Sequence, residues 1–136
     1  MLSDWEPPKF FNEYNHIKVK RLAGTIGAEI FGVDTSEDLD QDVIDEITEA
    51  LNEHHVIFFR DQNLEPKRQA AFAARFGALT PYPMVKGLDG SDEVVPVVKN
   101  ADERVNFGGI WHADTTYLEK PPMGARHRTA SSMPTD

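Results

Sequence analysis

The fold is constrained most by an acidic segment that runs almost directly into an apolar one. Residues 34–53 contain nine Asp and Glu and no Lys or Arg, and residues 56–59 are Val-Ile-Phe-Phe. Within the acidic segment, apolar residues recur at helical spacing: Val43, Ile44, Ile47 and Leu51. We therefore predict a helix that buries one stripe while its acids face water. The apolar run, with its β-branched and aromatic side chains, predicts a strand buried on both faces.

The start of this predicted helix carries a capping signal. Asp38 followed by Gln41 has the spacing of a capping box, in which each side chain binds the backbone N–H of the other residue. A calcium-binding loop is the alternative interpretation of the acids. Such a loop needs a turn-forming glycine among its oxygen ligands, and residues 34–53 contain none, so the sequence favours the solvated helix.

Alternation and turn residues predict a hairpin before the acidic segment. Residues 17–22 alternate as in a strand, although each face of that strand would carry both apolar and charged side chains. Gly24 and Gly27 frame a turn, and residues 28–33 can return as the second strand.

Three shorter elements are expected in the second half of the chain. Pro66 stands at a favoured first helical position, and Gly77 ends the short helix that follows. Residues 94–98 predict a strand that Pro96 confines to an edge or a bulge. Residues 111–118 predict the last strand.

Composition excludes several classes of function. The 136 residues suit one domain, and the net charge of −9 would repel a nucleic-acid backbone. The chain has no cysteine, so a metal site must use nitrogen and oxygen ligands. The first residues lack the basic and apolar regions of a signal peptide, and no apolar stretch is long enough to cross a bilayer. A cytoplasmic protein without membrane or nucleic-acid partners is expected.

A histidine and an aspartate stand two positions apart in the segment NFGGIWHADTTY. On a strand, His112 and Asp114 would point to the same face, about 6.5 Å apart along the backbone. Imidazole and carboxylate together suit a divalent transition metal. Gly108 and Gly109 would leave room for a ligand, and Trp111 would pack into the core from the opposite face. The alternative is a buried histidine, bound to a backbone carbonyl, beside a surface acid.

Three blocks, in this order and spacing, carry a family resemblance: EHHVIFFRDQNLEP, AAFAARFGALTPYP and NFGGIWHADTTYLEKPPMGA. Together, over residues 14–125, they resemble the N-terminal half of the Fe(II)- and 2-oxoglutarate-dependent dioxygenases of the taurine dioxygenase (TauD/TfdA) family. The most specific part is the W-H-x-D-T-T-aromatic block followed by PPxGA.

The resemblance implies a mainly β fold with flanking helices, as an incomplete double-stranded β-helix, which is the jelly-roll barrel of the clavaminate synthase-like enzymes. It implies an Fe(II) ion held by two histidines and one carboxylate, and His112 and Asp114 match the first histidine and the carboxylate. The implied cosubstrates are 2-oxoglutarate and dioxygen. The implied reaction hydroxylates a small anionic substrate, which could be a sulfonate, a sulfate ester or a carboxylate.

Four further positions are candidates for substrate binding by the same resemblance: Tyr82, Gly108, Thr115 and Tyr117. Tyr82 matches a substrate-contacting histidine of the taurine enzyme, Gly108 a substrate-contacting asparagine, and Tyr117 a phenylalanine near the substrate. A tyrosine hydroxyl can still bind an anion, but glycine cannot replace an amide donor, so another sulfonate, a sulfate ester or a carboxylate is as good a candidate substrate as taurine. The alternative role for Tyr82 is a loop aromatic that only packs.

The family's second histidine ligand and its 2-oxoglutarate-binding arginine have no match in this sequence, so cofactor-binding residues are expected beyond residue 136. We expect an N-terminal arm (1–15), the N-terminal part of a dioxygenase domain (16–125) and an aberrant polar tail (126–136). The remaining histidines fall outside the ligand positions of the family: His16, His54, His55 and His127. The hypothesis is a truncated family member that is inactive alone.

Two alternatives from other classes accompany this hypothesis. The first is a non-catalytic remnant or interaction module, which would present the apolar face of a half barrel to a partner or to another copy in a homo-oligomer. The second is a cupin-type metal protein with the same barrel, which would need further ligands close to the His-x-Asp pair. The sequence shows none there.

Overall fold

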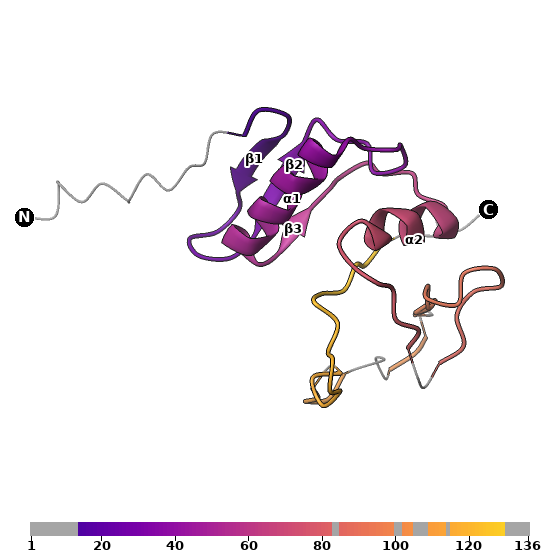
Figure 1. Cartoon of the computed structure of the whole chain (residues 1–136). Coiled ribbons are helices and arrows are strands. Elements are labelled where there is room, and N and C mark those ends of the chain that lie inside the picture. The colour runs from indigo at the N-terminus through magenta and orange to yellow at the C-terminus, as the bar shows by residue number, and fades with distance from the viewer. Residues whose placement is uncertain (1–13, 83–84, 100–101, 105–108, 114, 130–136) are drawn as a thin grey trace, which may run out of the picture. The chain divides into compact units, whose positions relative to one another are not determined.

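The computed structural model describes residues 14–82, 85–99, 102–104, 109–113 and 115–129. The chain divides into two compact units, Met1–Asn63 and Leu64–Asp136. Its helices and strands follow in the order β1 (Lys18–Arg21), β2 (Ala28–Phe31), α1 (Gln41–His54), β3 (Ile57–Phe58) and α2 (Pro66–Ala74) (Figure 1).

The first unit contains a three-stranded sheet in the order β1-β2-β3. β1 and β2 form the hairpin that the sequence predicts, and they pair antiparallel with Val19 opposite Ile30. Before β2, Gly27 has a φ of +98° and its carbonyl accepts a hydrogen bond from the Leu22 amide at 3.0 Å. Such a φ favours glycine, so the turn requires this residue at this place.

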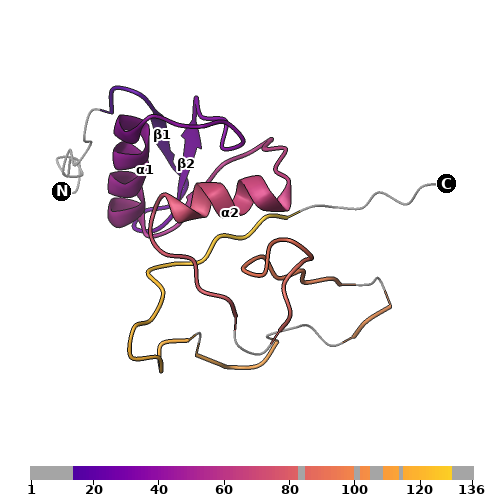
Figure 2. The same ribbon diagram turned by 45° about the vertical axis from the view of Figure 1, so that its right-hand side comes forward.

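α1 connects β2 to β3, which pair in parallel and therefore need a crossover between them. The helix lies against one face of the sheet, so that helix and sheet form two layers (Figure 1 and Figure 2). Ile44 and Ile47 expose 1% and 0% of their surface, and Val43 and Leu51 are half-buried. The predicted helix with one buried stripe is confirmed.

The predicted capping box is wrong. α1 begins at Gln41, and its N-cap is Asp40, which makes no side-chain hydrogen bond to the helix end. Gln41 is therefore the first helical residue, not the third, and its amide cannot reach back to Asp38 as a capping box requires. Instead, Gln41 Nε2 donates to Asp45 Oδ1 at 2.7 Å, one turn further along the helix.

β3 is a strand as predicted, but it is not buried on both faces. Only Ile57 and Phe58 have strand structure, and β3 pairs only with β2, at the edge of the sheet. Val56 exposes 41% and Phe58 44% of its surface. β3 lies at the sheet edge and has one pairing partner. Its apolar composition therefore predicted more burial than the segment has.

One side chain joins the loops that follow β2 and β3. Gln62 Oε1 accepts hydrogen bonds from the Thr35 amide at 2.7 Å and from the Thr35 hydroxyl at 2.9 Å. Gln62 Nε2 donates to the Val33 carbonyl at 3.2 Å and to the Arg60 carbonyl at 2.9 Å. Thr35 exposes only 1% of its surface, so these hydrogen bonds bind polar groups that water does not reach.

The second unit contains α2, which begins at Pro66 as predicted and ends before Gly77. Phe72 is its buried residue, and the Phe76 ring packs edge-on against Phe72 with 5.2 Å between the centroids. The predicted strand at residues 94–98 is wrong, since this segment has no regular structure. A strand needs a paired backbone, which the described residues do not provide there.

The described residues therefore carry more helix than strand. α1 and α2 have 14 and 9 residues, whereas the three strands have 4, 4 and 2. The mainly β architecture is thus not seen in the described part of the chain. Neither helix is long and apolar enough to span a membrane, and the described residues contain no other candidate span.

Candidate metal centre

His112 lies in the second unit on irregular backbone and is exposed. Its Nδ1 lies 2.7 Å from the carbonyl oxygen of Ile110. A carbonyl oxygen can only accept a hydrogen bond, so Nδ1 carries the proton in this contact. The ring lone pair is then on Nε2, and a backbone hydrogen bond to the opposite nitrogen is the usual arrangement of a metal-binding histidine. The alternative interpretation, a histidine bound to a backbone carbonyl, makes the same hydrogen bond, so the metal-ligand role of His112 stays a prediction.

Two of the predicted site residues, Asp114 and Gly108, lie outside the described residues. Whether the His112 and Asp114 side chains share a face stays a prediction. The predicted strand at residues 111–118 is wrong for the described positions, which form no strand. Trp111 is fully exposed, at 103%, so the prediction that it packs into the core is wrong as well. Without a paired strand, no second face exists into which this indole can pack.

Thr115 and Tyr117 lie in a tight turn. The Leu118 amide donates to the Thr115 carbonyl at 3.0 Å, and Thr115 has a φ of +20°, which strand residues do not adopt. Tyr117 exposes 70% of its surface, and Tyr82 exposes 43%. The exposure of Tyr82 argues against a ring that only packs within its loop. Both phenol groups are accessible to a ligand.

The remaining described histidines have other surroundings. In the first unit, His16 Nδ1 lies 3.1 Å from Glu46 Oε1, His54 exposes only 3% of its surface, and His55 caps the C-terminal end of α1 with a φ of +63°. Among the residues that the structure describes, no three His, Asp or Glu side chains gather in a way that could hold a metal ion. Asp114 lies outside these residues, so the ligand set around His112 stays a prediction.

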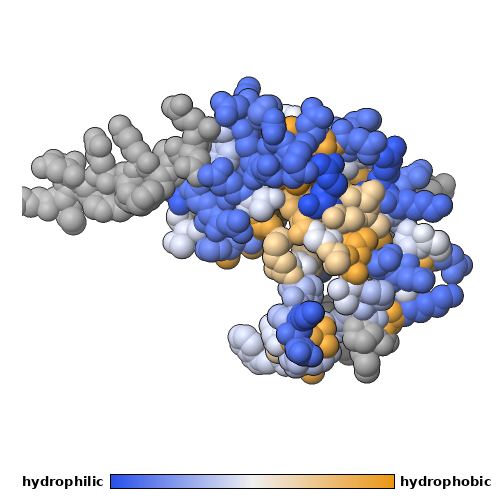
Figure 3. Space-filling model, viewed as in Figure 1, coloured by the Kyte–Doolittle hydropathy of each residue, from blue (hydrophilic) through white to orange (hydrophobic). Residues whose placement is uncertain are grey.

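The acidic segment does not form a calcium loop. Residues 34–53 are all described, and most of them belong to α1, whose acids Asp42, Asp45 and Glu49 are exposed. The hydrophilic surface over α1 in Figure 3 matches this arrangement. The solvated helix face that the sequence favours is confirmed, since carboxylates spread along a helix do not converge on one ion.

Arg126 makes a contact that no sequence pattern predicts. Its guanidinium carbon lies 4.8 Å from the centroid of the Phe72 ring, which is a cation–π geometry. Burial lowers the pKa of Arg126, and the charge of Arg128 lowers it further. Arg126, the first residue of the expected polar tail, thus contacts α2. No local pattern signals a contact between positions so far apart in the sequence.

A family model, "Taurine catabolism dioxygenase TauD, TfdA family", matches residues 18–125. An alkylsulfatase of Acinetobacter baylyi is 36% identical over 112 residues, covering 82% of this chain and 34% of the relative. An alpha-ketoglutarate-dependent sulfate ester dioxygenase of Pseudomonas putida is 38% identical over 110 residues, covering 80% of this chain and 36% of the relative.

A solved structure of a taurine dioxygenase is also similar to this chain. A taurine dioxygenase from Burkholderia xenovorans superimposes with a TM-score of 0.54 at 38% identity, over 57% of this chain and 28% of that one. The chain thus spans about a third of the length of the curated relatives that it matches.

Proposed function

Because the chain belongs to the taurine catabolism dioxygenase TauD, TfdA family, we propose that it carries the first part of an Fe(II)- and 2-oxoglutarate-dependent dioxygenase. His112 and Asp114 are the first two metal ligands in this proposal. The observation that supports it most directly is the hydrogen bond from His112 Nδ1 to the Ile110 carbonyl, which directs the lone pair to Nε2. Imidazole nitrogen and carboxylate oxygen form a donor set suited to ferrous iron.

The proposed fold of the complete catalytic unit is a jelly-roll barrel, to which this chain contributes the hairpin, α1 and the segment around His112. Bound iron and 2-oxoglutarate would supply the oxidising chemistry that hydroxylates a substrate carbon. The role of this chain is to orient the His112 ring through its backbone hydrogen bond and to present a carboxylate beside it. Dioxygen and a small organic anion are the further partners.

The proposed substrate is a sulfate ester. Two relatives, an alkylsulfatase and a sulfate ester dioxygenase, carry such esters in their names, and each covers at least 80% of this chain. Tyr82 and Tyr117 are accessible hydroxyl donors that can bind an anionic oxygen, and Thr115 can add a third. Gly108 in this proposal leaves space for the substrate and supplies no side-chain contact.

We propose further that the 136-residue polypeptide does not catalyse this reaction by itself. Catalytic sites of this kind use three protein ligands, and the sequence matches only the first two of the family's ligand positions, His112 and Asp114. The proposed cellular location is the cytoplasm. Residues 16–125 are the part assigned to the dioxygenase domain, between an arm (1–15) and a polar tail (126–136).

A chimera tests this function. Residues 1–125 would be fused to the part of the Pseudomonas putida sulfate ester dioxygenase for which this chain has no counterpart. We expect succinate and sulfate to form from 2-oxoglutarate and an alkyl sulfate, in a reaction that requires Fe(II). His112→Ala and Asp114→Ala should each abolish both products, whereas His55→Asn, at an exposed histidine with positive φ, should leave both rates within about twofold.

The 136-residue polypeptide is assayed beside the chimera. We expect it to form no more succinate than its own His112→Ala variant. A chimera whose turnover survives His112→Ala would refute the metal-ligand role. Succinate formation by the polypeptide alone, lost on His112→Ala, would refute the proposed inactivity and leave the ligand role standing.

A further inference from the structure

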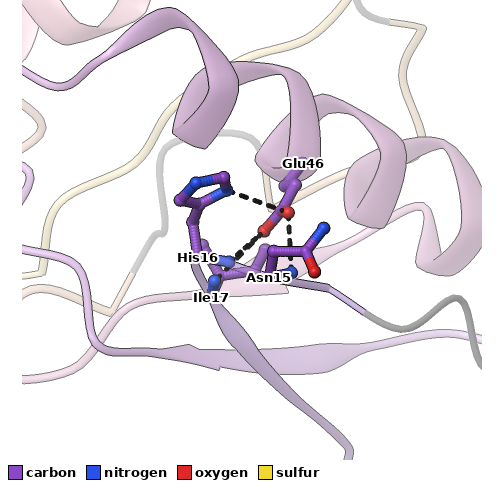
Figure 4. A network of polar contacts seen from close by, with 4 residues as sticks. All are labelled: Asn15, His16, Ile17 and Glu46. Carbon is purple, nitrogen blue, oxygen red and sulfur yellow. Dashed lines mark hydrogen bonds and ion pairs between the residues drawn. The ribbon is translucent and has the colours of Figure 1, made fainter.

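Glu46, in the middle of α1, binds the backbone of the segment that precedes β1 (Figure 4). Its Oε1 accepts a hydrogen bond from the Asn15 amide at 2.7 Å. Its Oε2 accepts from the His16 amide at 2.9 Å and from the Ile17 amide at 3.1 Å. The His16 ring adds Nδ1 at 3.1 Å from Oε1. A single carboxylate therefore binds three consecutive backbone amides and one side chain.

A second acid of α1 holds the residue before them. The Tyr14 hydroxyl donates to Glu53 Oε2 at 3.3 Å, and Glu53 lies two helical turns after Glu46, on the same side of the helix. Burial raises the pKa of Tyr14 to about 12, helped by the charges of Glu53, Glu49 and Glu46. The hydroxyl therefore stays protonated and remains a donor at any ordinary pH.

Residues 14–17, the N-terminal strap, carry no helix or strand structure of their own. The backbone amides of Asn15, His16 and Ile17 donate to Glu46 and not to a neighbouring strand. Directly after the strap, β1 is held by its pairing with β2, and Ile17 at the junction exposes only 4% of its surface. A segment held by side chains of one helix can open without breaking the sheet or that helix.

We propose that the N-terminal strap opens and closes as a local unit, and that the ionised Glu46 carboxylate is the latch that keeps it closed. The closed state protects the amides of residues 15–17 and covers Ile17. The open state releases the strap and exposes Ile17, while α1 and the β1–β2 hairpin stay folded. The latch is therefore a conformational device that is separate from the proposed metal centre.

The latch has a defined dependence on pH. Burial raises the pKa of Glu46, but the hydrogen bonds from Asn15, His16 and Ile17 outweigh it and lower the pKa to about 2 from 4.5. The stabilisation is complete above the ordinary value of 4.5 and is lost as pH falls from there toward 2. The other titratable groups around the strap are His16 and Tyr14 on it, and Glu49 and Glu53 on α1.

Amide hydrogen exchange, followed residue by residue by NMR, tests the proposal on the whole 136-residue chain. In Glu46→Gln, the amides of residues 15–17 should exchange about tenfold faster or more, because a neutral amide oxygen is a weaker acceptor than a carboxylate. The amides of Ile30 in β2 and Ile47 in α1 should exchange as in the parent protein. Glu37→Gln removes the same charge from an exposed loop residue and should change none of them.

Each other outcome overturns the proposal. Unchanged protection of residues 15–17 in Glu46→Gln would show that Glu46 is not the latch. An equal loss of protection at Ile47 and Ile30 would show that the strap does not open locally. In the parent protein, the Ile17 amide shift should titrate with a midpoint well below pH 4.5. A midpoint at the ordinary glutamate value would show that the carboxylate does not bind the strap.

Discussion

At the scale of single residues, Gly87 occupies a position that no other residue can take without rearrangement. The loop that follows it is closed by hydrogen bonds from the Leu88 amide to the Val94 carbonyl and from the Ser91 amide to the Leu88 carbonyl, both 2.9 Å. A Cβ on Gly87 would stand 2.2 Å from the Asp92 carbonyl oxygen, far inside van der Waals contact. The backbone on both sides of the loop leaves no space for a methyl group.

We predict that Gly87→Ala opens this loop. The backbone of Asp92 must move away from the new methyl group, which breaks the hydrogen bond between Leu88 and Val94. NMR chemical shifts and amide exchange of residues 88–94 would show the change. Gly24→Ala is the matched control, because nothing lies within 4 Å of a Cβ there. Parent-like shifts in both variants would contradict the packing at Gly87.

Gln62 carries the second prediction at this scale. Gln62→Ala should lower the free energy of unfolding by about 1–3 kcal/mol, because the buried Thr35 loses two hydrogen bonds. Gln62→Glu keeps an acceptor for Thr35, but it places a carboxylate oxygen against the Val33 and Arg60 carbonyl oxygens, so it should also lower the free energy of unfolding. Urea unfolding measures both values. A Gln62→Ala protein as stable as the parent would show that this side chain does not join the two loops.

Such contacts could not be predicted from the sequence. Thr35 and Gln62 are 27 positions apart, and Glu46 and Ile17 are 29 apart, so no local pattern connects either pair. His112 was predicted as a metal ligand because its segment is a recognisable block, and this role stays a prediction. Its partner Asp114 lies outside the described residues and remains a prediction.

At the scale of helices and strands, the sequence was informative where local spacing decides the structure. α1 follows from its apolar stripe, α2 from Pro66 and Gly77, and the hairpin from its turn glycines. These signals act within a few residues. The strands predicted at residues 94–98 and 111–118 depend on pairing partners, and a strand pattern without a partner does not form a strand.

The stripe of α1 gives the prediction at this scale. Ile47→Ala should lower the free energy of unfolding of the first unit by about 2–5 kcal/mol, because Ile47 is fully buried. Val56→Ala removes a half-exposed β-branched side chain and should change the free energy of unfolding by about 0.5 kcal/mol. Urea unfolding followed by far-UV circular dichroism compares the two. Equal losses would contradict the packing of α1 on the sheet.

At the scale of the whole molecule, the second unit exposes several large apolar side chains along residues 97–123. Their exposed fractions exceed 60%: Val97, Val98, Ile110, Trp111, Tyr117 and Met123. Contiguous exposed apolar surface drives association in water. Water-exposed side chains of this size favour contact with a second apolar surface.

We predict that the 136-residue polypeptide self-associates through this segment. Sedimentation velocity should show a concentration-dependent increase in the sedimentation coefficient, which Trp111→Ser reduces because Trp111 is the most exposed of these side chains. Val56→Ser, at a half-exposed apolar residue of the first unit, serves as the control. A monomer at all concentrations, or an association that Trp111→Ser leaves unchanged, would contradict this prediction.

The proposed metal centre requires His112 and Asp114 to bind one divalent metal ion. Paramagnetic broadening by Mn(II), which binds the same nitrogen and oxygen donors as ferrous iron and is stable in air, measures this directly in NMR spectra of the 136-residue chain. We expect substoichiometric Mn(II) to broaden the signals of residues 112–114 first, and His112→Ala to abolish that effect. Broadening confined to the acids of α1, with residues 112–114 unaffected, would contradict the proposed metal centre.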